Sequence, residues 1–247
     1  MTLSVDDCTR FISHYSSVFA EAARDNLAGD VEHCPEWDVA DLVRHLTEVH
    51  WFWSTIAEHR LSGPPEESSR PARPGGEALV ATFEAGAAHL VEVLAAADQS
   101  ASCWTWFPDE QNVAFITRHQ VQEAIVHTWD AVNAAGGSLD IDPVAAADSV
   151  DEFLTTSLVE DDDARERTFT PLDGTLVLRA TDTGDTWTLT DGTVPGAVVM
   201  SHGAAEGAPV VEATAADLLL WIYRRRDLPV GAAAELAARF SALTSTD

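Results

Sequence analysis

The chain is organised around one stretch, Arg118-His119-Gln120-Val121-Gln122-Glu123-Ala124-Ile125-Val126-His127-Thr128-Trp129-Asp130-Ala131. Small and apolar residues recur in it every three to four positions, which predicts an amphipathic helix. On that helix Glu123 and His127 stand four residues apart, so a carboxylate and an imidazole project from the same face one turn apart. The pair is interpreted as two ligands of a metal ion, and the alternative is a solvated hydrogen-bonded pair.

A third ligand has to come from another segment, and the best candidate is a second predicted amphipathic helix at residues 39–50. His45 is the histidine of this helix expected to face the core, because its neighbours are Leu42, Val43, Leu46 and Val49. Two histidines and one glutamate leave coordination open to water or substrate, which is typical of catalytic rather than structural zinc. The alternative for His45, Glu123 and His127 is a buried hydrogen-bonded trio.

Composition excludes several classes of protein. The 247 residues allow one large domain or two modest ones, and 46% hydrophobic residues with eight tryptophans exclude wholesale disorder. The formal net charge of −27 argues against nucleic acid or a membrane surface as a partner. Three scattered cysteines give no disulfide framework, and the chain lacks a signal-peptide pattern and any run of eighteen apolar residues. We expect a cytoplasmic protein that is a monomer or weak dimer.

Periodicity predicts two domains of different class. Helical patterns cover residues 6–26, 39–60 and 77–97 and a fourth segment from about residue 113, with Asp38 as a cap of the second helix. Four such helices predict a bundle, in which metal ligands point inward from facing helices. A further helix at 143–158 and an acidic connector at 160–163 follow. Beyond them a two-residue alternation predicts a hairpin over 172–190 and strands near 198–199 and 209–213, with helices at 215–226 and 232–243.

Three motifs in this order resemble one known family. They are Cys34-Pro35-x-Trp37 followed by Asp41-Leu42-Val43-x-His45-Leu46, the helix with Arg118, Glu123, His127 and Asp130-Ala131, and the tail Ala213-Thr214-Ala215-Ala216-Asp217-Leu218-Leu219-Leu220-x4-Arg225. Together they resemble the mycothiol-dependent maleylpyruvate isomerase family over nearly the whole chain. The resemblance implies an α+β fold, with a DinB-like metal-binding four-helix bundle at 1–160 and a small sterol-carrier-like α/β domain at 166–247.

The resemblance also implies a site and a chemistry. His45, Glu123 and His127 would bind Zn²⁺ or another divalent metal, and Arg225 would be a catalytic residue from the C-terminal domain. Mycothiol would bind the metal as a thiolate and attack a small, electrophilic, anionic substrate, in a cis–trans isomerase or a thiol S-transferase. Thr128 departs from the family, because many relatives carry an arginine there. The alternatives are a metal-binding regulatory protein without catalysis and a DinB-type zinc hydrolase.

Several other residues have plainer interpretations. We expect His50 and His119 at the surface or beside the ligands, and Cys34 and Cys103 in the core. Trp104, Trp106 and Phe107 are expected to pack over one end of the bundle. Arg225 stands in Arg224-Arg225-Arg226, which is also the kind of cluster that a helix C-terminus favours.

Overall fold

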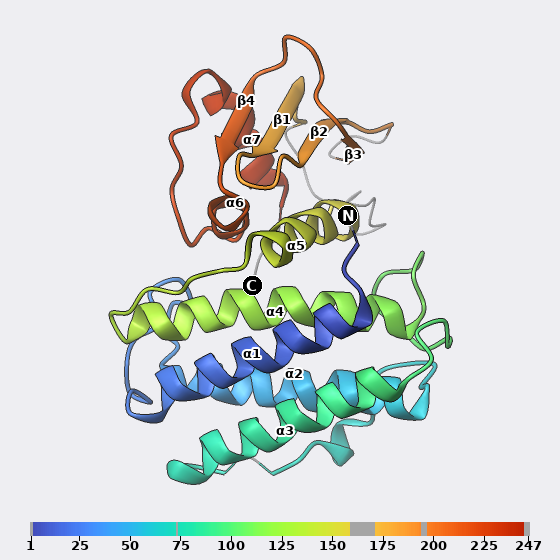
Figure 1. The fold of residues 1–247 in the computed structure, drawn as a ribbon, viewed down its shortest axis with the longest axis vertical. Helices are drawn as coiled ribbons and strands as arrows, with labels where there is room; N and C mark the ends of the chain where they lie inside the picture. The colour runs from blue at the N-terminus through green and yellow to red at the C-terminus, as the bar shows by residue number, and fades with distance from the viewer. Residues whose placement is uncertain (1, 73, 159–170, 194–196, 245–247) are drawn as a thin grey trace. The chain divides into compact units, whose positions relative to one another are not determined.

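The computed structural model describes residues 2–72, 74–158, 171–193 and 197–244. The chain divides into two compact units, Met1–Asp140 and Ile141–Asp247. The first is a helical bundle and the second combines helices with a four-stranded sheet (Figure 1). This arrangement confirms the predicted fold class, a four-helix bundle followed by a small α/β unit.

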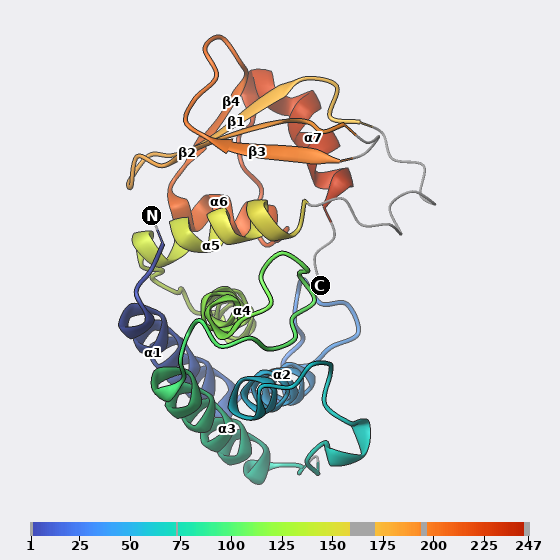
Figure 2. The same ribbon diagram turned by 90° about the vertical axis from the view of Figure 1, so that its right-hand side faces the viewer.

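The helical unit consists of α1 (Val5–Arg24), α2 (Val39–His59), α3 (Glu77–Ala96) and α4 (Val113–Ala134). Helix α4 packs against α1 and α2, and α3 packs against the same two helices from the other side (Figure 2). The predicted helices match these bounds closely, because buried apolar residues recur along each of them. The packing makes α2 and α4 neighbours, and these are the two helices on which the metal ligands were predicted.

Polar caps fix where the two ligand-bearing helices begin. The Asp38 side chain accepts a hydrogen bond from the Asp41 backbone N–H at 2.8 Å, and the Asp41 side chain accepts one from the Asp38 backbone N–H, forming a capping box. The Asn112 side chain accepts from the Phe115 backbone N–H at 3.0 Å. Each cap satisfies donors that a helix start leaves free, so the predicted role of Asp38 is confirmed.

Helix α3 is long and apolar enough, by length and composition alone, to cross a membrane between Ala78 and Ala96. Its large side chains Leu79, Phe83, Leu90 and Leu94 are nonetheless fully buried. The Phe83 ring, for example, lies 4.7 Å from the Phe19 ring of α1. The apolar composition of α3 is therefore also explained by its packing in the core of the bundle.

The α/β unit contains α5 (Pro143–Thr156), β1 (Thr175–Ala180), β2 (Thr186–Asp191), β3 (Val198–His202), β4 (Val210–Ala213), α6 (Ala215–Ile222) and α7 (Ala234–Leu243). The sheet order is β3-β2-β1-β4, with β4 parallel to β1 and the other pairs antiparallel. The predicted hairpin is β1–β2, and Gly184 in its turn has a φ of 82°, which glycine adopts without strain. Helix α6 packs on β1 and β4.

Two predicted boundaries differ from the observed ones. The division falls after Asp140 rather than at residue 160, because α5 packs against α6 and so belongs to the α/β unit. Helix α6 ends at Ile222 rather than near residue 226, because Arg224 takes a left-handed conformation with φ 61°. The acidic connector at 160–163 lies outside the described residues.

Candidate metal centre

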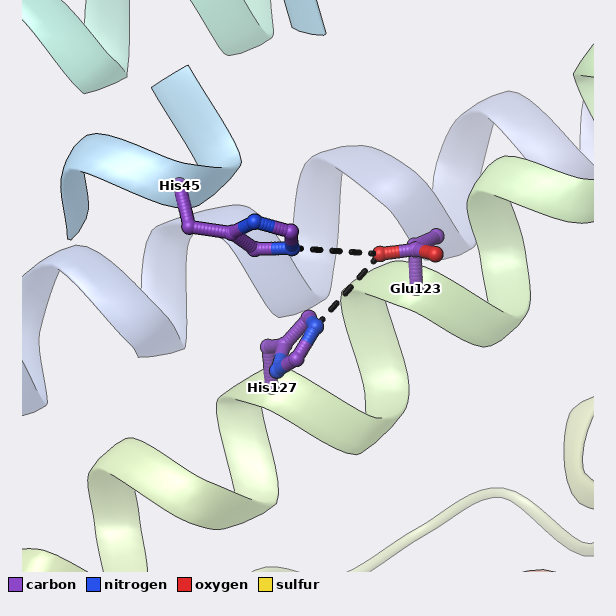
Figure 3. Close-up of side chains that lie close together, drawn as sticks. All are labelled: His45, Glu123 and His127. Carbon is purple, nitrogen blue, oxygen red and sulfur yellow. Dashed lines mark ion pairs between the residues drawn. The ribbon is translucent and has the colours of Figure 1, made fainter. Parts of the chain in front are cut away.

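Three side chains from two helices converge at one point of the bundle. His45 projects from α2, and Glu123 and His127 project from α4 (Figure 3). One ligand atom from each of them lies within 4.8 Å of the other two. The Nε2 atoms of His45 and His127 lie 4.0 Å and 3.5 Å from Oε2 of Glu123. The three residues that the sequence singled out are therefore brought together from segments about eighty residues apart.

The Glu123 carboxylate has two different sides. Its Oε1 faces Nε2 of His119 at 3.5 Å, whereas Oε2 faces the two imidazoles. The Oε2 atom is buried and has no hydrogen-bond partner among the residues that the structure describes. A buried carboxylate oxygen normally has such a partner, and leaving it without one is costly. A cation among these three side chains would satisfy this oxygen, so the donor set fits a divalent metal.

Asp130 orients the second imidazole. Its Oδ2 lies 3.2 Å from Nδ1 of His127, and both side chains are buried. In the neutral imidazole, a carboxylate at Nδ1 keeps the proton on that nitrogen and leaves the lone pair on Nε2, which is the atom that faces Glu123. This arrangement of carboxylate, histidine and open nitrogen is the usual environment of a metal-ligating histidine.

The charges in the site support one another before an ion binds. Burial alone would raise the pKa of Glu123, but the nearby imidazole of His127, together with the charges of His119 and His45, lowers that pKa to about 2. Burial alone would lower the pKa of His127, but Asp130 and Glu123 raise it to about 9. Glu123 is thus a ready anionic ligand at neutral pH, and a metal ion has to displace a proton from His127.

His45 is the most exposed member of the cluster. The side-chain exposure is 29% for His45, 19% for Glu123 and 8% for His127. The Trp37 ring lies 5.2 Å from the His45 ring and flanks it.

The remaining sequence predictions have mixed outcomes. His50 is 2% exposed and its ring lies 5.2 Å from the Phe83 ring, so a surface position was wrong. Cys103 is buried as predicted, whereas Cys34 is only partly buried. Trp106 is 41% exposed but its ring packs 5.3 Å from that of Phe115.

Thr128 and Arg225 each make a hydrogen bond within their own unit. The Thr128 hydroxyl is buried and donates to the Tyr15 carbonyl at 3.0 Å, so this residue ties α4 to α1 instead of facing the cluster. Arg225 belongs to the α/β unit, where it follows the left-handed Arg224 and donates from Nη1 to the Tyr223 carbonyl at 2.9 Å. Arg225 is 5% exposed, and its predicted catalytic role stays a prediction.

Sequence reasoning gave no role to Asp130 and left His119 between two interpretations. Both signals were present in the sequence, since His119, Glu123 and His127 are spaced four apart and Asp130 follows by three. These spacings place all four side chains along one face of a helix.

Fold and site together define a class: a four-helix bundle with a His-Glu-His cluster that could hold a metal ion, followed in the chain by a small α/β unit. Residues 12–132 match the family model of the mycothiol maleylpyruvate isomerase N-terminal domain. The matched residues span the helical unit from α1 to α4, so this unit belongs to that domain family.

Comparisons with individual proteins agree with that assignment. The crystal structure of the mycothiol-dependent maleylpyruvate isomerase superposes with a TM-score of 0.59 over 92% of both chains at 13% sequence identity, which shows a shared fold. A histidine-to-alanine mutant of that enzyme gives a TM-score of 0.58 over the same shares, also at 13% identity. The uncharacterized proteins MT0763 and Rv0738 of Mycobacterium tuberculosis are each 28% identical over 134 residues, covering 54% of this chain and 68% of each relative.

Proposed function

We propose that this protein is an enzyme dependent on a divalent metal and mycothiol, an isomerase or a thiol S-transferase acting on a small anionic electrophile. The observation that carries the proposal is the buried Oε2 of Glu123, which lies between two imidazole nitrogens and lacks a hydrogen-bond partner among the described side chains. Membership of the helical unit in the isomerase domain family supplies the thiol and the reaction class.

Each residue of the site has a distinct task in this proposal. His45, Glu123 and His127 would hold the ion, preferably Zn²⁺ because two imidazoles and one carboxylate suit it. Asp130 would hold the proton on Nδ1 of His127, which keeps Nε2 free for coordination. A bound Zn²⁺ would supply a Lewis acid that keeps a thiol deprotonated at neutral pH, and so a nucleophile for addition to an activated double bond or for transfer.

Arg225 is the proposed partner of the substrate's carboxylate. A guanidinium can bind a carboxylate through two parallel hydrogen bonds, which a lysine ammonium does not do. The chain contains no lysine, so arginine is the only side chain with a permanent positive charge available for this task. Its 5% exposure means that Arg225 would have to exchange a present contact for the substrate.

The test combines metal content with turnover. Purified protein and the His45→Ala variant are compared for bound zinc, and each is then incubated with mycothiol and an electrophile panel that includes maleylpyruvate. We expect about one metal ion per wild-type chain, loss of metal in the variant, and metal-dependent isomerisation or thiol consumption in the wild type only.

Other outcomes would point to other functions. Intact metal binding without turnover across a broad panel would favour a binding or regulatory protein of the same fold. Metal-dependent hydrolysis without any thiol would favour a zinc hydrolase. Equal metal content in the wild type and in His45→Ala would refute the proposed centre itself.

A further inference from the structure

We propose that His119 is a positioning residue that holds Glu123 as a one-oxygen ligand of the metal. This inference rests on the proposed function, because it concerns how the same centre is kept open for a thiol. Its basis is that the two oxygens of the Glu123 carboxylate face different residues. Oε1 lies 3.5 Å from Nε2 of His119, and Oε2 faces His45 and His127.

His119 is itself held in a fixed place. The Phe115 ring is stacked on it at 5.7 Å with an interplanar angle of 14°, and the Trp106 and Trp53 rings meet it edge-on at 5.7 Å and 6.1 Å. Only 12% of the His119 side chain is exposed. An imidazole enclosed by three aromatic rings has little freedom to turn, so its nitrogen presents a nearly fixed partner to Oε1.

His119 is a neighbour of the centre and not a fourth member of it. The residues whose ligand atoms all lie within 4.8 Å of one another are His45, Glu123 and His127 only, among the described residues. The nitrogen of His119 faces the carboxylate oxygen that points away from the other two imidazoles. Its position suits an outer partner of a ligand, a kind of residue that commonly sets ligand orientation.

The consequence concerns the number of open coordination positions. A glutamate can bind a metal through one oxygen or through both, and the second mode occupies a position that a thiol would need. By engaging Oε1, His119 would disfavour the two-oxygen mode and leave that position vacant. Chemistry at a metal requires such a vacancy, so His119 would act on turnover through Glu123 without touching the substrate.

The experiment uses Co²⁺ as a spectroscopic substitute for zinc in the full-length protein. Two substitutions are compared: His119→Phe keeps a planar ring among the aromatic neighbours but removes the nitrogen, and His119→Gln keeps an N–H donor. The matched control is His89→Phe, because His89 also faces a glutamate, with its Nε2 3.4 Å from Oε2 of Glu58, but lies in neither the metal cluster nor the aromatic enclosure. Circular dichroism establishes that each variant is folded.

We expect His119→Phe to weaken Co²⁺ affinity by about 10- to 100-fold, as loss of an outer partner usually does, with weaker visible absorption because a second carboxylate oxygen joins the metal. His119→Gln should restore much of both properties, and His89→Phe should match the wild type. If folded His119→Phe has the Co²⁺ affinity and the absorption spectrum of the wild type, this inference is wrong, while the proposed function stands. The same holds if His119→Phe and His119→Gln lose equal Co²⁺ affinity and their absorption spectra are unchanged. Absence of Co²⁺ binding in the wild type would overturn the proposed function and this inference with it.

Discussion

Acidification should destabilise the helical unit through one buried histidine, His50 of α2. Burial lowers its pKa from the usual 6.5 to about 4, with Glu123 opposing the effect and His45 adding to it. The folded protein therefore favours neutral His50, whereas the unfolded chain takes up the proton at pH 6.5. The contribution of His50 to stability is complete above pH 6.5 and is lost as the pH falls from 6.5 toward 4.

The magnitude follows from the difference between the two pKa values. Each pKa unit corresponds to about 1.4 kcal/mol, so the full difference is about 3 kcal/mol, of which about 2 kcal/mol is already lost at pH 5. A loss of this size is a large part of the stability of an ordinary domain, which is about 5–15 kcal/mol. It arises in the core beside Phe83, where Nδ1 of His50 has no partner among the described residues.

The assay is urea unfolding of the metal-free protein at pH 8 and pH 5. We expect the free energy of unfolding to fall between these values by about 2 kcal/mol less in His50→Leu than in the wild type. His14→Leu is the control, because it makes the same substitution at an exposed position of α1. An identical pH dependence in the wild type and His50→Leu would refute the reasoning.

Three further predictions concern the site. Asp130 and Glu123 raise the pKa of His127 to about 9 against the effect of burial, so Zn²⁺ has to compete with one proton. Zn²⁺ affinity should therefore rise about tenfold per pH unit between pH 6 and 8. A calorimetric titration in which the affinity does not change with pH would contradict this. Asp130→Asn should lower Zn²⁺ affinity by about 10- to 100-fold in chelator competition, and an unchanged affinity would remove Asp130 from the centre. Arg225→Gln should keep its metal but lose turnover of anionic electrophiles more than turnover of neutral ones. Equal losses for both kinds of electrophile would argue against hydrogen bonds from Arg225 to a substrate carboxylate.

Sequence periodicity predicted the bundle and the hairpin because both patterns are local. The stripe on α4 and the alternation from Thr175 to Thr190 depend only on which side of an element is buried. The partner of an element is not local information. Helix α5 is amphipathic in either unit, and only its packing on α6 showed that it belongs to the second.

The same limit explains what was predicted of the site. His45 was found because its apolar neighbours placed it on the buried face of α2. His50 was left between the surface and a position beside the ligands, because it lies on another face of that helix and the sequence does not say that α3 covers this face too. The role of His119 depended on the side to which each Glu123 oxygen points, which is a matter of side-chain geometry that spacing does not specify.

The charge of the centre bears on what it can bind. With neutral imidazoles, Glu123 and the buried Asp130 together carry two negative charges, which a divalent cation would neutralise inside the bundle. The strongly negative protein attracts such a cation but repels an anionic substrate. A carboxylate-bearing electrophile would therefore need local positive charge, and the loaded centre offers none in excess. The proposed anionic substrate therefore depends on the proposed role of Arg225. If Arg225 does not bind the substrate, a neutral electrophile would be the better substrate.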